Sequence, residues 1–136
     1  MPLSAQYKTF STLKPEEKNN IPPCIECQDL DHRKKMLDDH EIICIDLYAT
    51  WCQPCKEIAP KFAELAQLYN TPGRCLLFKE NVDHGLTRDY NITGIPAFIF
   101  YRRGQLVRKQ DGSPLDVIGG DINKVRNILD KLLGRG

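Results

Sequence analysis

The sequence predicts an α/β fold with a central mixed β-sheet flanked by helices on both faces. The segment Ile42–Tyr48 is almost continuously apolar, which is typical of a strand that is covered on both sides. An amphipathic helical pattern over 54–69 follows it, and further apolar strands begin at Cys75 and Ala97. This order of strand, helix and strands favours a sheet that is covered by helices.

Length and composition fit one domain. A chain of 136 residues buries enough surface to fold without disulfide staples. The net charge of +1 comes from interspersed acidic and basic residues, so no clustered basic face for nucleic acid is expected. No apolar run approaches the ~18 residues of a membrane span, and residues 1–20 lack the apolar core of a secretory signal. We therefore expect a cytoplasmic monomer without nucleic-acid or membrane partners.

The first part of the chain carries weak signals. Residues 1–20 are polar and have no period, so we interpret them as an N-terminal extension with the composition of a flexible segment. Residues 21–136 form the predicted domain. Its first elements are a short strand at 24–26 and a helix over 29–39 that rests on few apolar positions.

The helix over 54–69 is the most clearly periodic element. Pro60 lies inside it and should kink it, because proline has no N–H to donate and its ring crowds the preceding turn. The breaker residues at 71–73 end it. Its apolar positions are Ile58, Phe62, Leu65, Ala66 and Tyr69.

The second half of the chain predicts shorter elements around a loop at 111–114. Asp121 is a residue type that caps helices, and an apolar stripe follows it. In order, we expect a strand at 75–78, a short helix near 85–90, a strand at 97–101, a turn at 102–104, a strand near 105–109 and a final helix that ends at Gly134.

Two cysteines between the first long strand and the helix after it carry the chemistry. A helix start has free N–H groups and a partial positive charge, and both favour the thiolate of Cys52. The spacing brings the sulfur of Cys55 within bonding reach, and Pro54 suits the first helical turn. This pattern predicts a redox pair. The alternatives are a structural pair and half of a zinc site, which needs about four ligands.

From residue 21 onwards, the chain resembles the thioredoxin family. Leu47–Lys56 resembles that family's active-site segment, with Gln53 in place of its usual glycine. Ile58–Pro60 matches the kinked part of its helix, Gly94–Pro96 its cis-proline loop, and Ile118–Gly120 an edge of its substrate groove. The resemblance implies the thioredoxin fold.

The resemblance also implies catalytic roles. Cys52 would attack a substrate disulfide, and Cys55 would resolve the mixed disulfide. Asp46 falls where the family keeps a buried carboxylate, which would exchange a proton with Cys55. Lys79 falls where the family keeps a partner lysine. The alternatives are an Asp46 that points to water and a Lys79 that is simply solvated.

A substrate-binding surface is implied around the cis-proline. Pro96 would be cis rather than an ordinary trans proline. The Ile95 backbone would offer strand-like hydrogen bonds to a substrate, although any groove residue could serve packing alone. The residues expected to contact substrate are Trp51, Gln53, Pro54, Ile95, Pro96, Ile118 and Gly119.

The implied activity is a thiol–disulfide oxidoreductase that reduces protein disulfides. An NADPH-dependent flavin reductase, similar to thioredoxin reductase, would supply the electrons, and no bound cofactor or metal is expected. Two alternatives remain open: a disulfide oxidase or isomerase with a higher reduction potential, and a partner-binding module that keeps only the fold.

The chain departs from the family pattern at a second C-x-x-C pair, Cys24 and Cys27. These cysteines could be idle thiols, a second disulfide, or zinc ligands together with His32 or His40. A further alternative is that this pair and the extension dock a dedicated partner. The stretch between Gly104 and Gly119 is also longer than is usual in the family.

Overall fold

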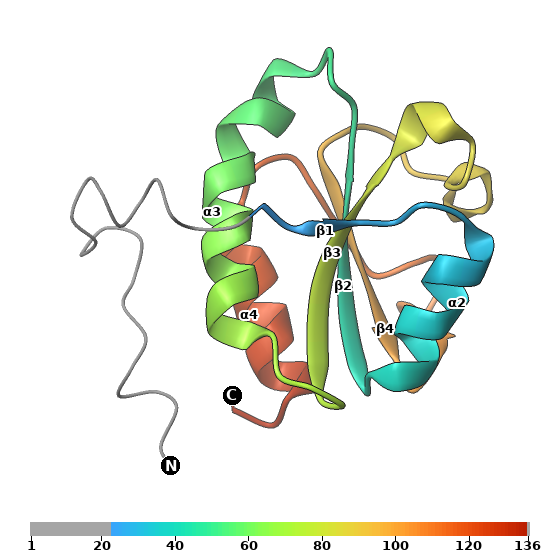
Figure 1. Ribbon diagram of the computed structural model, residues 1–136, viewed down its shortest axis with the longest axis vertical. Helices are drawn as coiled ribbons and strands as arrows, with labels where there is room; N and C mark the ends of the chain where they lie inside the picture. The colour runs from blue at the N-terminus through green and yellow to red at the C-terminus, as the bar shows by residue number, and fades with distance from the viewer. Residues whose placement is uncertain (1–22, 136) are drawn as a thin grey trace.

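The computed structural model describes residues 23–135, so the predicted extension at 1–20 lies outside the described residues. A mixed sheet forms the centre, with the strand order β1-β3-β2-β4-β5 and with β6 beside β4. Figure 1 shows α3 and α4 on one face of this sheet and α2 on the other. The predicted α/β architecture is therefore confirmed. No helix among the described residues is long and apolar enough to cross a membrane.

The elements follow one another along the chain in the order that gives this sheet. The first three strands of the sheet, β1, β3 and β2, are parallel, and β4 runs antiparallel to β2. The strands are β1 (Ile25–Glu26), β2 (Ile42–Tyr48), β3 (Cys75–Asn81), β4 (Ala97–Arg102), β5 (Gln105–Leu106) and β6 (Asp116–Ile118). The helices are α2 (Leu30–Asp39), α3 (Gln53–Tyr69) and α4 (Ile122–Leu132), with single 3-10 turns η3 (Val82–His84) and η4 (Arg88–Tyr90).

Side-chain caps explain where α2 and α4 begin. The Asp29 carboxylate accepts a hydrogen bond from the His32 backbone N–H at 2.7 Å. Asp121 does the same for the N–H of Lys124 at 3.1 Å. Each cap satisfies one of the N–H groups that a helix start leaves unpaired, which stabilises the helix by about 1 kcal/mol.

Two predictions in the second half of the chain were right in place but not in extent. Within the range expected for a short helix, 85–90, only the last three residues are helical, as the 3-10 turn η4. The strand expected near 105–109 ends at Leu106, and Arg108 forms only an isolated bridge with Pro114. The reason is that the chain leaves β4 after Val107 and pairs with the returning segment: the Leu115 N–H donates to the Val107 carbonyl at 2.9 Å, and the Lys109 N–H donates to the Ser113 carbonyl at 2.8 Å.

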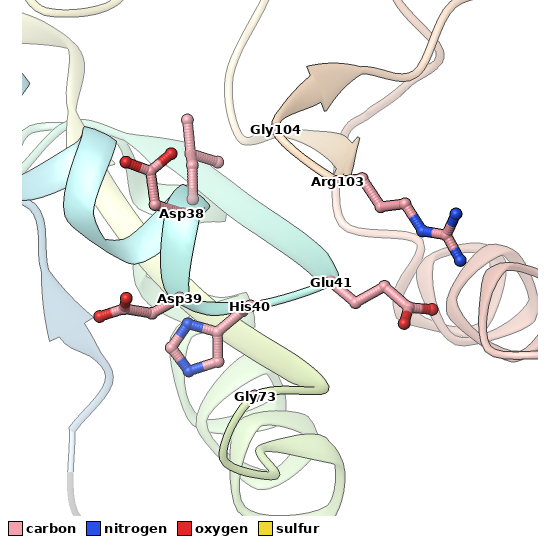
Figure 2. Close-up of a pocket in the computed structure, with 8 residues that line it drawn as sticks. Asp38, Asp39, His40, Glu41, Gly73, Arg103 and Gly104 are labelled. Atoms are coloured by element: carbon pink, nitrogen blue, oxygen red, sulfur yellow. The ribbon is translucent and has the colours of Figure 1, made fainter.

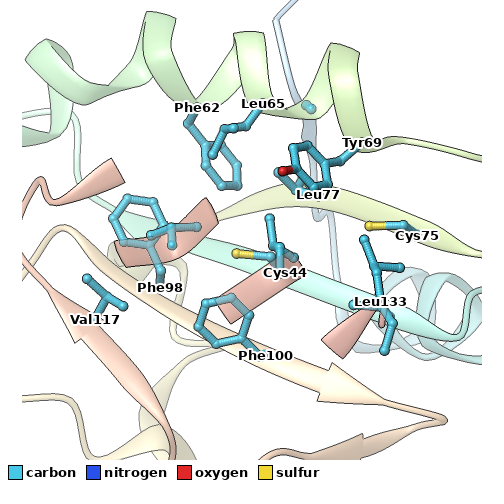
Figure 3. Close-up of a cluster of buried hydrophobic side chains, with 14 of the residues drawn as sticks. Cys44, Phe62, Leu65, Tyr69, Cys75, Leu77, Phe98, Phe100, Val117 and Leu133 are labelled. Atoms are coloured by element: carbon cyan, nitrogen blue, oxygen red, sulfur yellow. The ribbon is translucent and has the colours of Figure 1, made fainter. Parts of the chain in front are cut away.

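Two hydrophobic cores form because residues of β2 alternate between the faces of the sheet. Ile43, Ile45 and Leu47 pack on the α2 side. Ile42 and Cys44 pack on the side of α3 and α4. Figure 3 shows this second core, in which the Phe62 and Phe98 rings lie 5.5 Å apart. Each such buried side chain contributes about 1.5–3 kcal/mol of transfer free energy, which holds α3 against the sheet.

Candidate active site

The two cysteines of the motif meet at the first turn of α3. Cys52 is the N-cap of α3 and forms a disulfide with Cys55, with the Cα atoms 5.3 Å apart. The Cys55 backbone N–H points at Cys52 Sγ across 3.3 Å. Once the disulfide is reduced, the same N–H and the positive end of α3 stabilise a thiolate at Cys52. The pair thus has the geometry of a redox disulfide, and the described residues contain no cluster of three or more His, Cys, Asp or Glu that could hold a metal.

A loop with a cis peptide bond lies against the disulfide. The Ile95–Pro96 bond is cis, and the Ile95 carbonyl oxygen lies 3.8 Å from Cys52 Sγ. The Gly119 N–H donates to the Pro96 carbonyl at 2.7 Å and ties the end of β6 to this loop. Gly119 has a φ of 95°, in the left-handed region that favours glycine. The structure therefore brings together three segments that are far apart in the sequence: Cys52, the Ile95–Pro96 loop and Gly119.

Exposed apolar side chains surround the pair. Trp51 is 67% exposed and Ile118 is 43% exposed, although both are large hydrophobic residues. A Cβ atom on Gly94 would lie 3.3 Å from Ile118 Cγ2, so Ile118 packs close beside the cis-proline loop. Gln53 and Pro54 are also exposed at the helix start. Apolar side chains that stay exposed beside a reactive group are typical of a binding surface.

Trp51 is held by a residue that the sequence analysis missed. Its indole N–H donates to Asp83 Oδ2 at 2.9 Å, and the Asp83 N–H donates in turn to Asn81 Oδ1 at 2.9 Å. A hollow of about 310 Å³ opens next to them, lined by Trp51, Val82, Thr87, Ile92, Thr93, Gly94 and Ile95. No signal in the sequence marks this contact, because Trp51 and Asp83 are 32 residues apart along the chain.

Asp46 is buried behind the disulfide. It is 4% exposed, which excludes the alternative that it points to water. Asp46 and Cys55 line the same cavity of about 220 Å³. Burial raises the pKa of Asp46 to about 7, while the nearby Lys79 ammonium acts to lower it. Asp46 Oδ1 accepts no hydrogen bond from the described part of the chain, so this oxygen is free to take a proton.

Lys79 lies on β3 at the register position next to Asp46 and lines the same cavity. Its ammonium pairs with a residue that was not predicted, Glu26, at 3.9 Å, and lies 5.1 Å from the centre of the Tyr48 ring. The Tyr48 hydroxyl donates to the same Glu26 carboxylate. Lys79 is therefore not simply solvated, because it has an ion-pair partner and an aromatic neighbour.

Cys24 and Cys27 do not form a second disulfide. Both are free, and they lie on opposite faces of the sheet, Cys24 against the α3 core and Cys27 in the α2 core. Residues three apart in an extended chain point in opposite directions, which is why the C-x-x-C spacing does not bring these two sulfurs together. Burial raises the pKa of Cys24 to about 12 and that of Cys27 to about 11. Both thiols are therefore poor nucleophiles.

A hollow of about 350 Å³ lies at the opposite end of the sheet (Figure 2). It contains none of the predicted site residues. Its polar lining residues come from the end of α2, from the two residues before β2 and from the turn after β4. Its lining residues are Leu37, Asp38, Asp39, His40, Glu41, Gly73, Arg103 and Gly104.

Comparisons with known proteins all point to one family. The family model described as Thioredoxin matches residues 23–123. Thioredoxin-T of Drosophila melanogaster is 34% identical over 116 residues, which cover 84% of this chain and 68% of that protein. A thioredoxin of Neurospora crassa is 32% identical over 99 residues, which cover 71% and 76%. The reduced Schistosoma mansoni thioredoxin pre-protein structure is 34% identical, with a TM-score of 0.66 over 82% of this chain and 99% of that one.

Proposed function

The chain belongs to the thioredoxin family and is a thiol–disulfide oxidoreductase that reduces protein disulfides, and on this premise we propose how its residues divide the reaction. Cys52 is the attacking nucleophile, Cys55 the resolving thiol and Asp46 the group that exchanges the proton. The observation that carries this assignment is a shared cavity: Asp46 lines it together with Cys55, whose disulfide with Cys52 lies at the start of α3.

The first step forms a mixed disulfide. The Cys52 thiolate attacks one sulfur of the substrate disulfide, so that a Cys52–substrate bond forms, the substrate S–S bond breaks and the other substrate sulfur leaves as a thiolate. The N–H of Cys55 and the positive end of α3 stabilise the attacking thiolate. Because Cys52 is the N-cap, it is the sulfur best placed for this role.

The second step releases the substrate. The Asp46 carboxylate takes the proton of Cys55, either directly or through water in the cavity. The Cys55 thiolate then attacks Cys52 Sγ, the Cys52–Cys55 disulfide forms, and the second substrate sulfur leaves as a thiolate. The enzyme dithiol loses two electrons and the substrate disulfide gains them, so the electrons balance without a bound cofactor.

Substrate docks across the cis-proline loop. A substrate segment that runs in extended form along this loop would pair with the Ile95 backbone, next to Pro96. The Ile95 carbonyl lies beside Cys52 Sγ, so a segment paired there presents its own sulfur to the nucleophile. Its side chains would contact the surrounding surface, which is formed by Trp51, Gln53, Pro54, Ile118 and Gly119.

Regeneration needs an external electron donor. The dithiol must be restored after every turnover, and we assign that step to an NADPH-dependent flavin reductase similar to thioredoxin reductase. We place the chain in the cytoplasm as a monomer. The support for a reducing compartment is that the four cysteines outside the redox pair are all free thiols.

A trapping experiment tests the two-step scheme. The variant Cys55→Ser lacks the resolving thiol, so it is expected to accumulate a mixed disulfide between Cys52 and a protein substrate such as insulin. Cys52→Ser is the matched control and is expected to trap nothing. A Cys55→Ser protein that forms no adduct, or a Cys52→Ser protein that forms one, would contradict the assignment of nucleophile and resolving thiol.

A further inference from the structure

Three charged side chains form a row across neighbouring strands beside the redox pair. Glu26 on β1 is the register partner of Lys79 on β3, and Lys79 is the register partner of Asp46 on β2. Register partners in neighbouring parallel strands project from the same face of a sheet. Asp46 and Lys79 line one cavity with α3, so the row lies on the α3 face. It places one ammonium group between two carboxylates.

The ammonium of Lys79 is paired with the outer carboxylate. Lys79 Nζ lies 3.9 Å from Glu26 Oε1, and the two side chains are 30% and 29% exposed. Tyr48 holds both partners, because its hydroxyl donates to Glu26 Oε1 and its ring centre lies 5.1 Å from Nζ. At the other end of the row, Asp46 Oδ1 has no hydrogen-bond partner among the described residues. Lys79 therefore acts on Asp46 through space and without a direct contact.

We propose that Glu26 is a positioning residue for the proton-transfer step: it holds the Lys79 ammonium at the outer end of the row and so limits how strongly that ammonium stabilises the Asp46 carboxylate. The inference rests on the proposed function, in which this carboxylate takes the proton of Cys55. Its physical basis is that the attraction between opposite charges grows as their distance shrinks and as water is excluded.

The consequence is a carboxyl group that exchanges protons near neutral pH. Burial raises the pKa of Asp46, and Lys79 opposes that rise. If Lys79 were released from Glu26, Asp46 would be the next carboxylate in the row. The ammonium would then lie closer to Asp46 and lower its pKa. A more acidic Asp46 would take the Cys55 proton less readily.

Other ionisable groups also surround Asp46, and none of them occupies the position of Glu26. The half-buried Cys24 thiol and the buried Cys44 thiol lie near Asp46, and desolvation raises the pKa of both. On the neighbouring strand β4, the register partner of Asp46 is Phe98, and this side chain carries no charge. The ionisable groups near Asp46 are Lys79 on β3, Cys24 just before β1, Cys44 and Tyr48 on β2, and Cys55 and Lys56 on α3.

The experiment follows the titration of Asp46 itself. The carboxyl carbon of Asp46 is observed by NMR between pH 4 and pH 10 in the oxidised full chain, for the wild type, Glu26→Gln, Lys79→Met and the double variant. Glu26→Gln is expected to lower the titration midpoint by about half a pH unit, and Lys79→Met to raise it. In the Lys79→Met background, the Glu26→Gln shift is expected to disappear, because Glu26 acts through Lys79.

Two control variants distinguish a positioning role of Glu26 from a structural role and from an effect of net charge. Glu41→Gln removes the same charge at a surface pair with Arg74 and is expected to leave the Asp46 midpoint unchanged. Glu26→Asp keeps the charge and is expected to restore most of the wild-type midpoint. A residue with a structural role alone would lower the free energy of unfolding in urea without moving the titration.

Two results would overturn the inference. One is a Glu26→Gln protein with the wild-type midpoint, and the other is a shift of equal size with and without Lys79. The titration is measured without turnover, so it is independent of the proposed function. If the midpoints move as expected but turnover does not follow the Asp46 titration, the proton-transfer role of Asp46 fails while the control of Asp46 by Glu26 stands.

Discussion

The Trp51 indole N–H donates to Asp83 Oδ2 at 2.9 Å, which fixes a side chain that is otherwise 67% exposed. Asp83 is itself oriented by Asn81, at the end of β3. An exposed tryptophan normally samples several rotamers, and ordering it at the moment of binding costs free energy. The bond therefore prepares the apolar surface beside Cys52 for a substrate.

Breaking this bond is expected to weaken substrate binding more than it slows the chemistry. Asp83→Ala should raise KM for a protein disulfide about fivefold, which corresponds to the loss of one hydrogen bond, with kcat nearly unchanged. Asp83→Asn keeps an acceptor oxygen and serves as the matched control with a small effect. Steady-state insulin reduction measures both constants, and a fall in kcat at constant KM would contradict this role.

The stability of the oxidised protein is expected to fall as pH rises through the Asp46 titration. The folded pKa of about 7 lies above the ordinary value of 3.8, so the native state binds the proton more tightly than the unfolded state does. The stabilisation from the neutral carboxyl is complete below about pH 4 and is lost as pH rises through about 7. Over the whole window it amounts to about 4 kcal/mol.

Asp46→Asn removes this dependence, because the amide is neutral at every pH. Urea unfolding of the oxidised variant is expected to show higher stability than the wild type at pH 8 and a shrinking difference towards pH 5. An equal difference between the two proteins at both pH values would show that Asp46 does not titrate in this range.

Removing one partner of the buried ion pair between Arg33 and Glu80 is expected to lower the free energy of unfolding strongly. Arg33 Nε lies 2.7 Å from Oε1 of the fully buried Glu80 carboxylate, and Arg33 Nη2 also donates to the Leu86 carbonyl. Arg33→Met alone leaves a buried charge and should cost about 3–5 kcal/mol of unfolding free energy. The double variant Arg33→Met/Glu80→Leu should recover most of that loss. Urea unfolding midpoints test this, and additive losses would contradict it.

The fold was largely predictable where the chain gives long periodic signals. The continuous apolar run of β2 and the helical stripe of α3 each extend over many residues, and both elements formed as predicted. The three residues of β6 expose Ile118 and bury only Val117 fully, so no period marks them as a strand. Their pairing with β4 comes from the tertiary structure.

The site was predictable only where its residues belong to one local motif or to the family pattern. Cys52 and Cys55 form a motif that is recognisable from a few consecutive residues. Glu26 and Asp83 contribute through strand register and through a hydrogen bond to a distant tryptophan. Neither relationship has a signal in the linear sequence, because each depends on which strands become neighbours.

The thiols of Cys24 and Cys27 are expected to be unreactive in the folded protein. Burial raises the pKa of both thiols well above neutral pH. Alkylation of the oxidised protein with iodoacetamide at pH 8 should therefore be about a hundredfold slower at these residues than in urea-unfolded protein. Cys24→Ala and Cys27→Ala are each expected to leave the reduction potential of the Cys52–Cys55 pair unchanged. Fast modification of Cys24 or Cys27 in the folded state would contradict this prediction.

The reaction depends on the first turn of α3, which makes Cys52 a thiolate near neutral pH and leaves Cys55 to resolve the adduct. The most direct measurement is the pH dependence of alkylation in the reduced protein, with each modified cysteine identified by mass spectrometry. Cys52 is expected to be modified first, with a midpoint below the ordinary value of about 8.5 for a free thiol. Modification of Cys55 before Cys52, or a Cys52 midpoint at or above about 8.5, would contradict it.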